Sequence, residues 1–142
     1  MRSLLDVNVL IALLDSDHAS HHGALAWFGD HANEGWASCP ITQNGCVRIM
    51  SHPGYPNARS VNEIVRRLRA ATGDRTHEFW PDDLSVLDES VIEATRIHGP
   101  RQLTDIYLLA LAARNGGRLV TFDASIASSA VKGATAAHLL HL

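Results

Sequence analysis

The sequence predicts an α/β fold in which a short, mostly parallel sheet is flanked by helices on both faces. Short apolar segments alternate with longer segments of helical periodicity, and this alternation favours parallel strands joined by helical crossovers. The length of 142 residues corresponds to one domain, with no internal repeat, linker or low-complexity segment. Ligands bind beyond the carboxyl ends of the strands in such sheets, so residues that follow a strand are the first functional candidates.

The amino-terminal half is predicted to contain two short strands and three helices. An apolar run follows Asn8, a residue type favoured at helix N-caps, and Pro40 suits the first turn of a later helix. The expected elements are a strand at Arg2–Leu5, helices at Val9–Leu14 and His21–Asn33, a strand at Trp36–Ser38 and a helix at Pro40–Met50.

The carboxyl-terminal half is predicted to alternate in the same way. Ser60 and Glu63 have the spacing of a capping box, and Thr104 is expected to cap a nearly all-apolar, buried helix. The expected elements are helices at Ser60–Thr72, Ser90–His98 and Asp105–Asn115, and strands at His77–Trp80, at Arg118–Phe122 and within Thr135–Leu142.

Composition excludes several classes of protein. The chain has 15 acidic and 12 basic residues, a net charge of −3 and 46% hydrophobic residues, which excludes a collagen-like, disordered or strongly basic protein. No apolar run has the length of a membrane-spanning helix, and Asp6 stands where a signal peptide needs its apolar stretch. Cys39 and Cys46 fit no disulfide framework or zinc pattern. We therefore expect a cytoplasmic protein that does no redox chemistry.

Three aspartates are predicted to meet at one edge of the sheet. Asp6 follows the first strand and Asp123 follows the strand Arg118–Phe122, so both lie at the carboxyl edge. Asp105 is the first residue of the helix that precedes this strand. The helix is roughly 15 Å long and the strand runs back over roughly 20 Å, so the start of the helix and the end of the strand lie at the same edge. Gln43, in the first turn of its helix, is expected in the same crevice, where it either supports the acids or is an ordinary polar surface residue of a first turn.

Carboxylates that converge in this way favour a metal site. Three of them repel one another unless a cation neutralises them, and hard oxygen ligands suit Mg²⁺ or Mn²⁺. Magnesium held by one or two carboxylates, water and a substrate phosphate recurs in phosphodiester chemistry. Singly, each aspartate has an ordinary structural explanation, because Asp is common in turns and at helix starts. Their convergence is what indicates a function.

Four segments, in this order, together resemble a PIN-domain ribonuclease of the VapC toxin type: Leu5-Asp6-Val7-Asn8-Val9-Leu10-Ile11, Thr42-Gln43-Asn44-Gly45-Cys46-Val47-Arg48-Ile49, Leu103-Thr104-Asp105 and Thr121-Phe122-Asp123. The resemblance spans essentially the whole chain. It implies a PIN-like three-layer fold, with residues 1–142 as a single PIN domain. It also implies a metal-dependent endoribonuclease toxin that acts on cellular RNA such as tRNA or rRNA, forms a homodimer and is neutralised by a VapB-type antitoxin.

The resemblance places the catalytic acids of the family on Asp6, Asp105 and Asp123, with Asp6 and Asp105 as the principal magnesium ligands. It gives Asn8 an orienting role. Gln43 departs from the family, in which many members have Glu, and an amide oxygen ligates or accepts a hydrogen bond without contributing charge. The implied reaction is phosphodiester hydrolysis by bound water, leaving 5′-phosphate and 3′-hydroxyl ends.

Arginines are the candidates for contact with RNA. Arg66, Arg67 and Arg69 form either a solvated helix face or a track for the RNA backbone. We hypothesise that neutralising the three together weakens RNA binding and flattens its salt dependence; an unchanged salt slope in a filter-binding titration contradicts this. Arg48 either binds a substrate phosphate or structures the site.

Other functions fit the sequence less well. His18, His21 and His22 resemble a zinc cluster, but adjacent residues do not share a helix face. An aspartyl-nucleophile phosphatase needs a second Asp where this chain has Asn8, and neither a GxGxxG nor a P-loop motif is present. The main alternative is a catalytically weakened PIN fold that binds RNA or an antitoxin. Gln43 supports this alternative, because it replaces a charged Glu of the family with a neutral amide.

Overall fold

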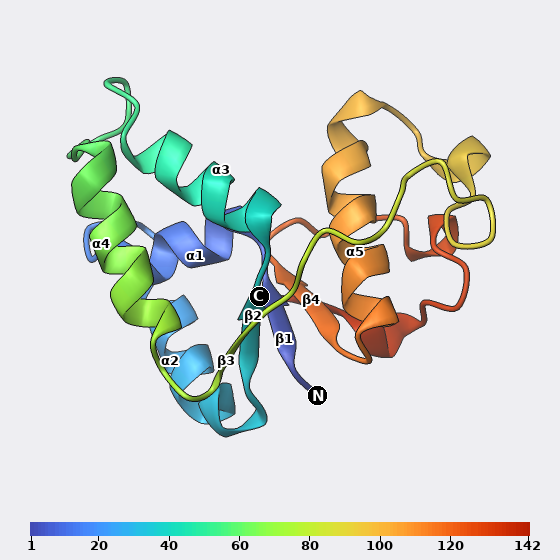
Figure 1. Ribbon diagram of the computed structural model, residues 1–142, viewed down its shortest axis with the longest axis horizontal. Helices are drawn as coiled ribbons and strands as arrows, with labels where there is room; N and C mark the ends of the chain where they lie inside the picture. Colours follow the sequence, from blue (N-terminus) through green and yellow to red (C-terminus); the bar gives the residue numbers. More distant parts are fainter.

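A five-stranded parallel sheet lies at the centre of the protein, between two layers of helix and loop, in a computed structural model that describes residues 1–142 (Figure 1). The strand order is β3-β2-β1-β4-β5, and every neighbouring pair is parallel. The strands are β1 (Ser3–Leu5), β2 (Trp36–Ser38), β3 (His77–Phe79), β4 (Arg118–Thr121) and β5 (Leu139–His141). The predicted α/β three-layer fold is therefore confirmed.

Five α-helices and five short 3₁₀ turns connect the strands. The helices are α1 (Val7–Leu14), α2 (His21–His31), α3 (Pro40–Met50), α4 (Val61–Thr72) and α5 (Leu103–Arg114). The 3₁₀ turns are η1 (Ala32–Glu34), η2 (Ala94–Arg96), η3 (Pro100–Gln102), η4 (Ser128–Ala130) and η5 (Ala136–His138). None of these helices combines the length and the apolar character needed to cross a membrane.

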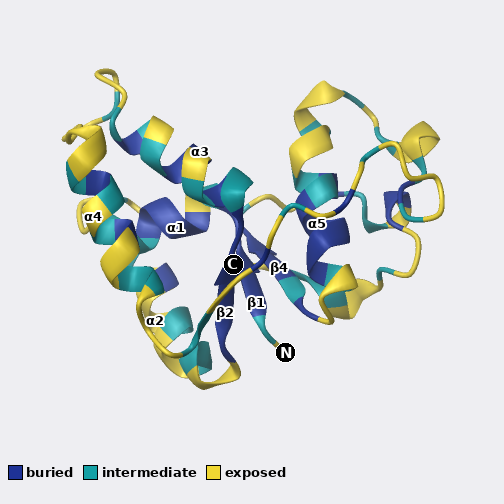
Figure 2. Ribbon diagram, in the orientation of Figure 1, coloured by how far each residue is buried: buried dark blue, intermediate teal, exposed yellow.

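Each face of the sheet carries its own hydrophobic cluster, because successive strand residues point to opposite faces. Leu4 and Leu119 are fully buried in the cluster that contains the inner side of α5. Leu5 and Val120, one residue further along their strands, are fully buried in the cluster beneath α1, α3 and α4. Figure 2 shows the buried strands and the buried side of α5. Burial on both faces explains why the strands are apolar throughout instead of alternating.

The strand order reverses direction beside β1. From β1 the chain adds β2 and then β3 on one side, and it later adds β4 and β5 on the other. Leu4 pairs with Leu119 and Leu5 with Val120, so the residues after β1 and β4 emerge side by side. Such a reversal opens a crevice beyond the carboxyl ends of the strands, and it is the usual place for a ligand in an open α/β sheet.

Two helices begin earlier than the sequence predicts. The N-cap of α1 is Asp6, whose Oδ1 accepts the Val7 backbone N–H at 2.7 Å, so the expected cap, Asn8, lies inside the helix. Helix α5 begins at Leu103 directly after η3, and Thr104 is an exposed first-turn residue without a capping bond. Val7 is partly buried against the core and extends α1, whereas Leu103 is exposed and α5 continues directly from the turn η3.

Other predicted boundaries hold more closely. Ser60 caps α4 by accepting the Glu63 backbone N–H at 3.1 Å. Helix α2 ends at His31, where the sequence predicts Asn33, and η1 continues the turn before Gly35, whose φ of +83° suits glycine. The predicted last strand forms at β5, within the expected segment.

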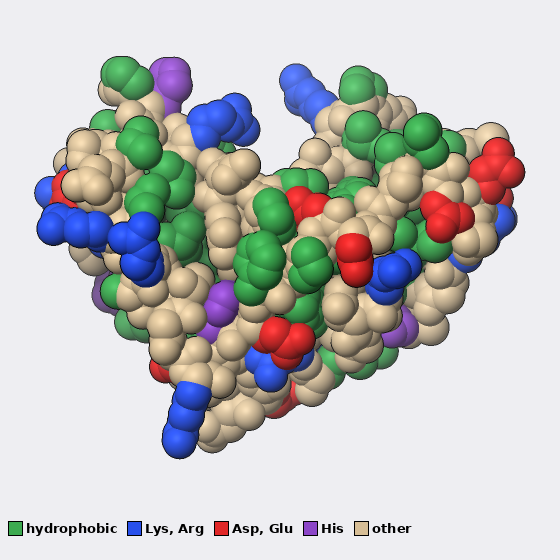
Figure 3. All heavy atoms as spheres, in the orientation of Figure 1, with side chains coloured by type: hydrophobic (Ala, Val, Ile, Leu, Met, Phe, Trp, Pro, Cys, Tyr) green, Lys and Arg blue, Asp and Glu red, His purple; other side chains and the backbone are tan.

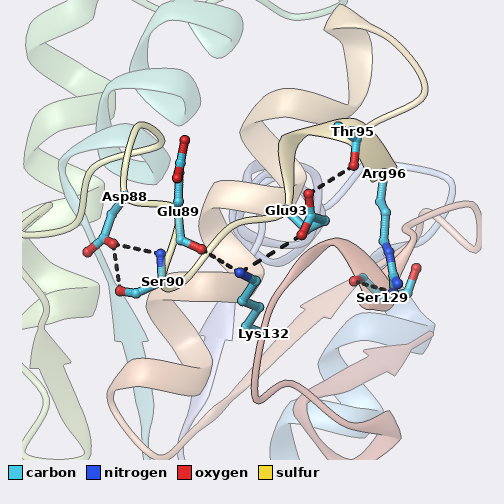
Figure 4. A network of polar contacts seen from close by, with 8 residues as sticks. All are labelled: Asp88, Glu89, Ser90, Glu93, Thr95, Arg96, Ser129 and Lys132. Atoms are coloured by element: carbon cyan, nitrogen blue, oxygen red, sulfur yellow. Dashed lines mark hydrogen bonds and ion pairs between the residues drawn. The ribbon is translucent and has the colours of Figure 1, made fainter.

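The helix predicted at Ser90–His98 is wrong. Only η2 is helical there, and short side chains bond the local backbone instead: Asp88 accepts from the Ser90 N–H and hydroxyl, at 3.0 and 2.6 Å. Lys132 then holds the segment by donating to the Glu89 carbonyl at 2.7 Å and pairing with Glu93 at 3.9 Å (Figure 4). Local bonds of this kind compete with helix formation, and here they outweigh the apolar periodicity.

Candidate active site

The structure brings the three predicted aspartates together at the reversal point of the sheet. Asp6 follows β1 directly, Asp123 lies two residues beyond β4, and Asp105 stands in the first turn of α5. The charges of Asp6 and Asp123 both raise the pKa of Asp105, which places the three carboxylates within electrostatic range of one another. The lengths expected for the helix before Asn115 and for the strand after it therefore predicted correctly that these residues lie at the same edge of the sheet.

Asp6 is held rigidly at the base of this arrangement. Its side chain caps α1 through Oδ1, and its Oδ2 accepts the Thr121 hydroxyl at 2.8 Å. The residue is 7% exposed. Burial raises the pKa of Asp6, while the hydrogen bonds from Thr121 and Val7 oppose that rise. With both oxygens already engaged by donors, Asp6 presents its remaining lone pairs in one orientation.

Thr121 is a site residue that sequence reasoning missed. Its side chain is fully buried; the hydroxyl donates to Asp6 and accepts the Asp123 backbone N–H at 3.0 Å. One hydroxyl thus sets the position of two of the three acids. The sequence contains one signal for this role: Thr121 is a polar residue at the end of an otherwise apolar strand, two residues before Asp123. A buried hydroxyl at such a position needs hydrogen-bond partners.

The other two acids differ in protonation. Asp123 is exposed, and its Oδ1 accepts the Ser125 hydroxyl at 2.6 Å and the Ser125 N–H at 2.7 Å, bonds that lower its pKa. The carboxylate of Asp105 is half-buried and accepts no hydrogen bond. Burial, followed by the charges of Asp6 and Asp123, raises the pKa of Asp105 to about 6. Near neutral pH the crevice therefore holds a concentrated negative charge.

The donor set suits a hard divalent cation. No Lys, Arg or His forms an ion pair with Asp6, Asp105 or Asp123. Besides the Ser125 hydrogen bonds, the charge of His141 lowers the pKa of Asp123, and no basic residue acts in this way on Asp6 or Asp105. No group of three His, Cys, Asp or Glu side chains is close enough to form a complete protein cage. An open site with one or two carboxylate ligands is what Mg²⁺ accepts, because it retains several waters. Asp6 and Asp105 are the residues that would hold it.

Gln43 does not bond any of these acids. Its Nε2 donates to Ser38 Oγ at 2.9 Å, and that hydroxyl is also 2.8 Å from His77 Nε2 on β3. The residue of α3 that packs against α1 is Gly45, where an added Cβ would lie 2.7 Å from the side chain of Val7, the residue after Asp6. Gln43 lies two residues from Gly45 and so points to another side of the helix. The expectation that Gln43 enters the crevice is wrong for this reason.

Asn8 and Thr104 also lie outside the hydrogen bonds of the site. Both are exposed, and neither side chain forms a hydrogen bond. Asn8 is in the first turn of α1, where its neighbour Asp6 has taken the capping role. Thr104 is adjacent to Asp105 on α5 without touching its carboxylate through a hydrogen bond.

The arginines divide into paired and unpaired groups. Arg67 pairs with Glu63 at 3.3 Å, as does Arg59 at 3.5 Å, so Arg67 is already engaged. Arg48, Arg66 and Arg69 are exposed and form no ion pair or hydrogen bond, which leaves no structural role for Arg48. A further unpaired residue, Arg101 in η3, was missed; it precedes Asp105 by four residues, about one helical turn.

Two of these unpaired cations belong to elements that flank the crevice. Arg48 is the one basic residue of α3, and Arg101 the one basic residue of η3. Figure 3 shows basic side chains on both rims of the hollow between α3 and the start of α5, with acidic side chains at its base. A polyanion that enters the hollow therefore meets positive charge at both rims before it reaches the acids.

The histidines form no metal centre. His21 Nδ1 lies 2.7 Å from the Ala12 carbonyl and donates to it, and His18 Nδ1 accepts the Ser20 N–H at 3.0 Å. A nitrogen that donates to a carbonyl does not bind a metal ion. The zinc interpretation of His18, His21 and His22 thus has no structural support.

Comparison with known proteins agrees with this geometry. The model of the PIN domain matches residues 3–132. The chain is 56% identical over 142 residues to Ribonuclease VapC44 of Mycobacterium tuberculosis, covering all of both chains. It is 45% identical over 134 residues to Ribonuclease VapC39 of the same species, covering 94% of this chain and 96% of the relative.

A solved structure shares the fold at low identity. The crystal structure of VapBC2 from Rickettsia felis bound to a DNA fragment from their promoter matches with a TM-score of 0.55 and 14% identity, over 88% of this chain and 90% of that one. The family model, the full-length relatives and the acids at the reversal point of the sheet agree. The chain belongs to the PIN-domain family, within its VapC group.

Proposed function

We propose that this chain is a VapC-type toxin, a Mg²⁺- or Mn²⁺-dependent endoribonuclease that hydrolyses phosphodiester bonds in cellular RNA such as tRNA or rRNA. The observation that carries the proposal is the cluster of Asp6, Asp105 and Asp123, in which neither Asp6 nor Asp105 has a basic partner. The full-length identity to proteins named ribonuclease VapC supports the same activity. The whole chain acts as one cytoplasmic domain in this proposal.

Each residue of the site has a part in hydrolysis. Asp6 and Asp105 would hold a divalent ion, which would supply Lewis-acid polarisation of the scissile phosphate and a more acidic water. Asp123 keeps Oδ2 free to orient the attacking water, because Ser125 occupies only Oδ1. Thr121 fixes both Asp6 and the backbone of Asp123. Arg48 and Arg101 bind substrate phosphates from the two rims.

The same charge distribution fits the proposed partners. A VapB-type antitoxin neutralises the toxin by placing a basic residue in the acidic crevice, where it substitutes for the cation. The toxin itself is a homodimer in this proposal. An antitoxin whose inserted basic residue is replaced by Ala should bind more weakly in a pull-down; unchanged affinity contradicts this mode of inhibition.

A second candidate is a catalytically weakened PIN fold that binds RNA or an antitoxin without cutting. It is favoured by Gln43, which brings no charge and bonds Ser38 instead of the acids. The crevice then contains three acids in place of a larger set, which weakens its attraction for a cation.

One experiment separates the two. Purified, antitoxin-free protein is incubated with total cellular RNA in Mg²⁺, Mn²⁺ or EDTA, and cleaved ends are mapped by sequencing. The nuclease predicts discrete, EDTA-sensitive cuts with 5′-phosphates that disappear in Asp6→Asn and Asp105→Asn while RNA binding persists. Cleavage by both variants at the parental rate contradicts the assignment of the acids. Binding without cleavage under any metal supports the second candidate.

A further inference from the structure

A pocket with a volume of about 300 Å³ lies between α3 and α4, and we call it the α3–α4 pocket. Val47 of α3 and Val65 and Leu68 of α4 form its apolar walls. It lies on a different side of α3 from Gly45, which faces Val7 of α1. Helix α3, roughly 10 Å across with its side chains, is therefore the ridge that separates this pocket from the acidic crevice.

Three polar residues of the pocket keep free hydrogen-bonding capacity, whereas the hydroxyl of the fourth, Thr72, donates to the Arg69 carbonyl at 3.2 Å. Gln43 donates one side-chain N–H to the Ser38 hydroxyl, which fixes the orientation of the amide. The Oε1 atom of Gln43 accepts no hydrogen bond. The exposed side chain of Asn44 forms no hydrogen bond, and the guanidinium of Arg69 has no acidic partner. This contrasts with Arg67, which precedes Leu68 on α4 but does not line the pocket, and which pairs with Glu63. Two carboxamides and one cation therefore converge with free hydrogen-bonding capacity.

Neighbouring pockets lack this combination. The pocket between α1, α2 and α4 has about the same volume, but ten of its 11 lining residues are hydrophobic, and the other is the acid Asp74. The pocket beside η2 contains Glu89 and Glu93, whose charges repel a phosphate. Of these three pockets, the α3–α4 pocket is the one that joins apolar walls, amide groups and an unpaired arginine.

These features match one chemical class of ligand. Apolar side chains receive the flat face of a nucleobase, and Asn or Gln side chains pair with two atoms on a base edge. An arginine binds the attached phosphate through a planar fork of donors. About 300 Å³ is at the lower limit for a ligand pocket, so it accommodates a single base and not a longer segment. Single-stranded RNA is the nucleic acid whose bases are free to enter such a pocket.

We propose that the α3–α4 pocket is a subsite for one base of single-stranded RNA, in which Gln43 and Asn44 hydrogen-bond the edge of the base and Arg69 binds its phosphate. This deepens the proposed nuclease function and rests on it for its biological meaning. The base belongs to a nucleotide close to the scissile phosphate, because only the width of α3 separates the subsite from the crevice. The pocket thus gives the enzyme a preference for sequence that the acids themselves do not provide.

Binding of short RNA tests the subsite without relying on catalysis. Labelled eight-residue homopolymers of A, C, G and U are titrated against the wild-type protein in EDTA and followed by fluorescence anisotropy. We expect one homopolymer to bind about tenfold more tightly than the weakest one, the discrimination of one bidentate base contact. Asn44→Ala removes that preference. Asn62→Ala, the matched control, preserves it, because Asn62 is exposed on α4 and does not line the pocket.

The arginines provide a second matched pair. Arg69→Met reduces affinity for the preferred homopolymer several-fold more than for the others, whereas Arg66→Met, which lies outside the pocket, weakens all four equally. Equal binding of all homopolymers, no binding, or an unchanged preference in Asn44→Ala overturns the proposal. Equal effects of Arg69→Met and Arg66→Met overturn it as well.

Mapping of cleaved ends connects the subsite with cleavage. In total RNA with Mg²⁺, Asn44→Ala is expected to broaden the base found at one fixed position near the cut, and Asn62→Ala is not. If the wild type cuts nothing, the proposed nuclease fails while the homopolymer titration still decides the subsite. If the wild type cuts and Asn44→Ala cuts with the same base preference, the nuclease stands and the subsite is overturned.

Discussion

Replacing Asp105 by Asn should stabilise the metal-free protein while removing its activity. Burial and the charges of Asp6 and Asp123 raise the pKa of Asp105 from its ordinary value of 3.8 to about 6. A carboxyl group whose pKa is higher in the folded than in the unfolded state favours folding when protonated. The stability of the wild type therefore falls as pH rises from about 4 through about 6, and Asn avoids this loss because it carries no charge.

The magnitude follows from the difference between the two pKa values. A difference of about 2 pH units corresponds to about 3 kcal/mol at pH 7, an upper limit because the half-buried carboxylate is partly screened by water. We expect Asp105→Asn to gain about 1–2 kcal/mol at pH 7, which raises the Tm by about 4–8 °C for a domain of this size. At pH 4 the gain shrinks to a few tenths of a kcal/mol, roughly, since Asp105 of the folded wild type is then neutral.

The assay is thermal and urea unfolding in EDTA between pH 4 and pH 8. The matched control is Asp30→Asn, an exposed position on α2 without hydrogen bonds, which should change stability by less than about 0.5 kcal/mol. An Asp105→Asn variant that is no more stable than the wild type at pH 7, or equally more stable at pH 4 and pH 7, refutes the reasoning. Addition of Mg²⁺ should stabilise the wild type and leave Asp105→Asn nearly unchanged.

Three further predictions concern the other parts of the site and the fold. Thr121→Val leaves a buried oxygen of Asp6 without its hydrogen-bond donor and should lower the free energy of unfolding by about 1–3 kcal/mol. Isothermal titration should show Mg²⁺ binding weakened about tenfold or more, and an unchanged metal affinity contradicts the positioning role of Thr121. Arg48→Met and Arg101→Met should each reduce the slope of log K against log [salt] for single-stranded RNA by about 0.7, whereas Arg67→Met should change it less, because Glu63 already occupies Arg67. Gly117→Ala places a Cβ 2.6 Å from the Arg2 carbonyl oxygen and should destabilise the fold by about 1–3 kcal/mol in urea titrations without changing metal affinity.

The paired arginine has a consequence for the charge track on α4. Neutralising Arg66, Arg67 and Arg69 together is still expected to weaken RNA binding, but the loss should come from Arg66 and Arg69. Removing Arg67 also leaves Glu63 with Arg59 as its one partner, which makes the same face less positive. A filter-binding titration of the three single variants at several salt concentrations measures the separate contributions.

The order of strands and helices and the edge at which the aspartates meet follow from the sequence. Apolar segments of three to five residues alternate with helical periodicity, and a parallel sheet brings the carboxyl ends of β1 and β4 to one edge whatever the packing details. Asp6, Asp105 and Asp123 are therefore predictable, because each stands at the end of a strand or the start of a helix.

The directions of individual side chains depend on packing that no local pattern encodes. Gln43 misses the crevice because the contact of Gly45 with Val7 sets the rotation of α3. Asp6 caps α1 in place of Asn8, since the helix begins at Val7, two residues earlier than expected. The segment Ser90–His98 has helical periodicity, yet it is held by Lys132, 34 or more residues away in the chain. Thr121 links two acids only once β1 and β4 are side by side. Sequence patterns determine which face of an element is apolar, whereas the partners of its polar groups are decided by contacts between residues that are distant along the chain.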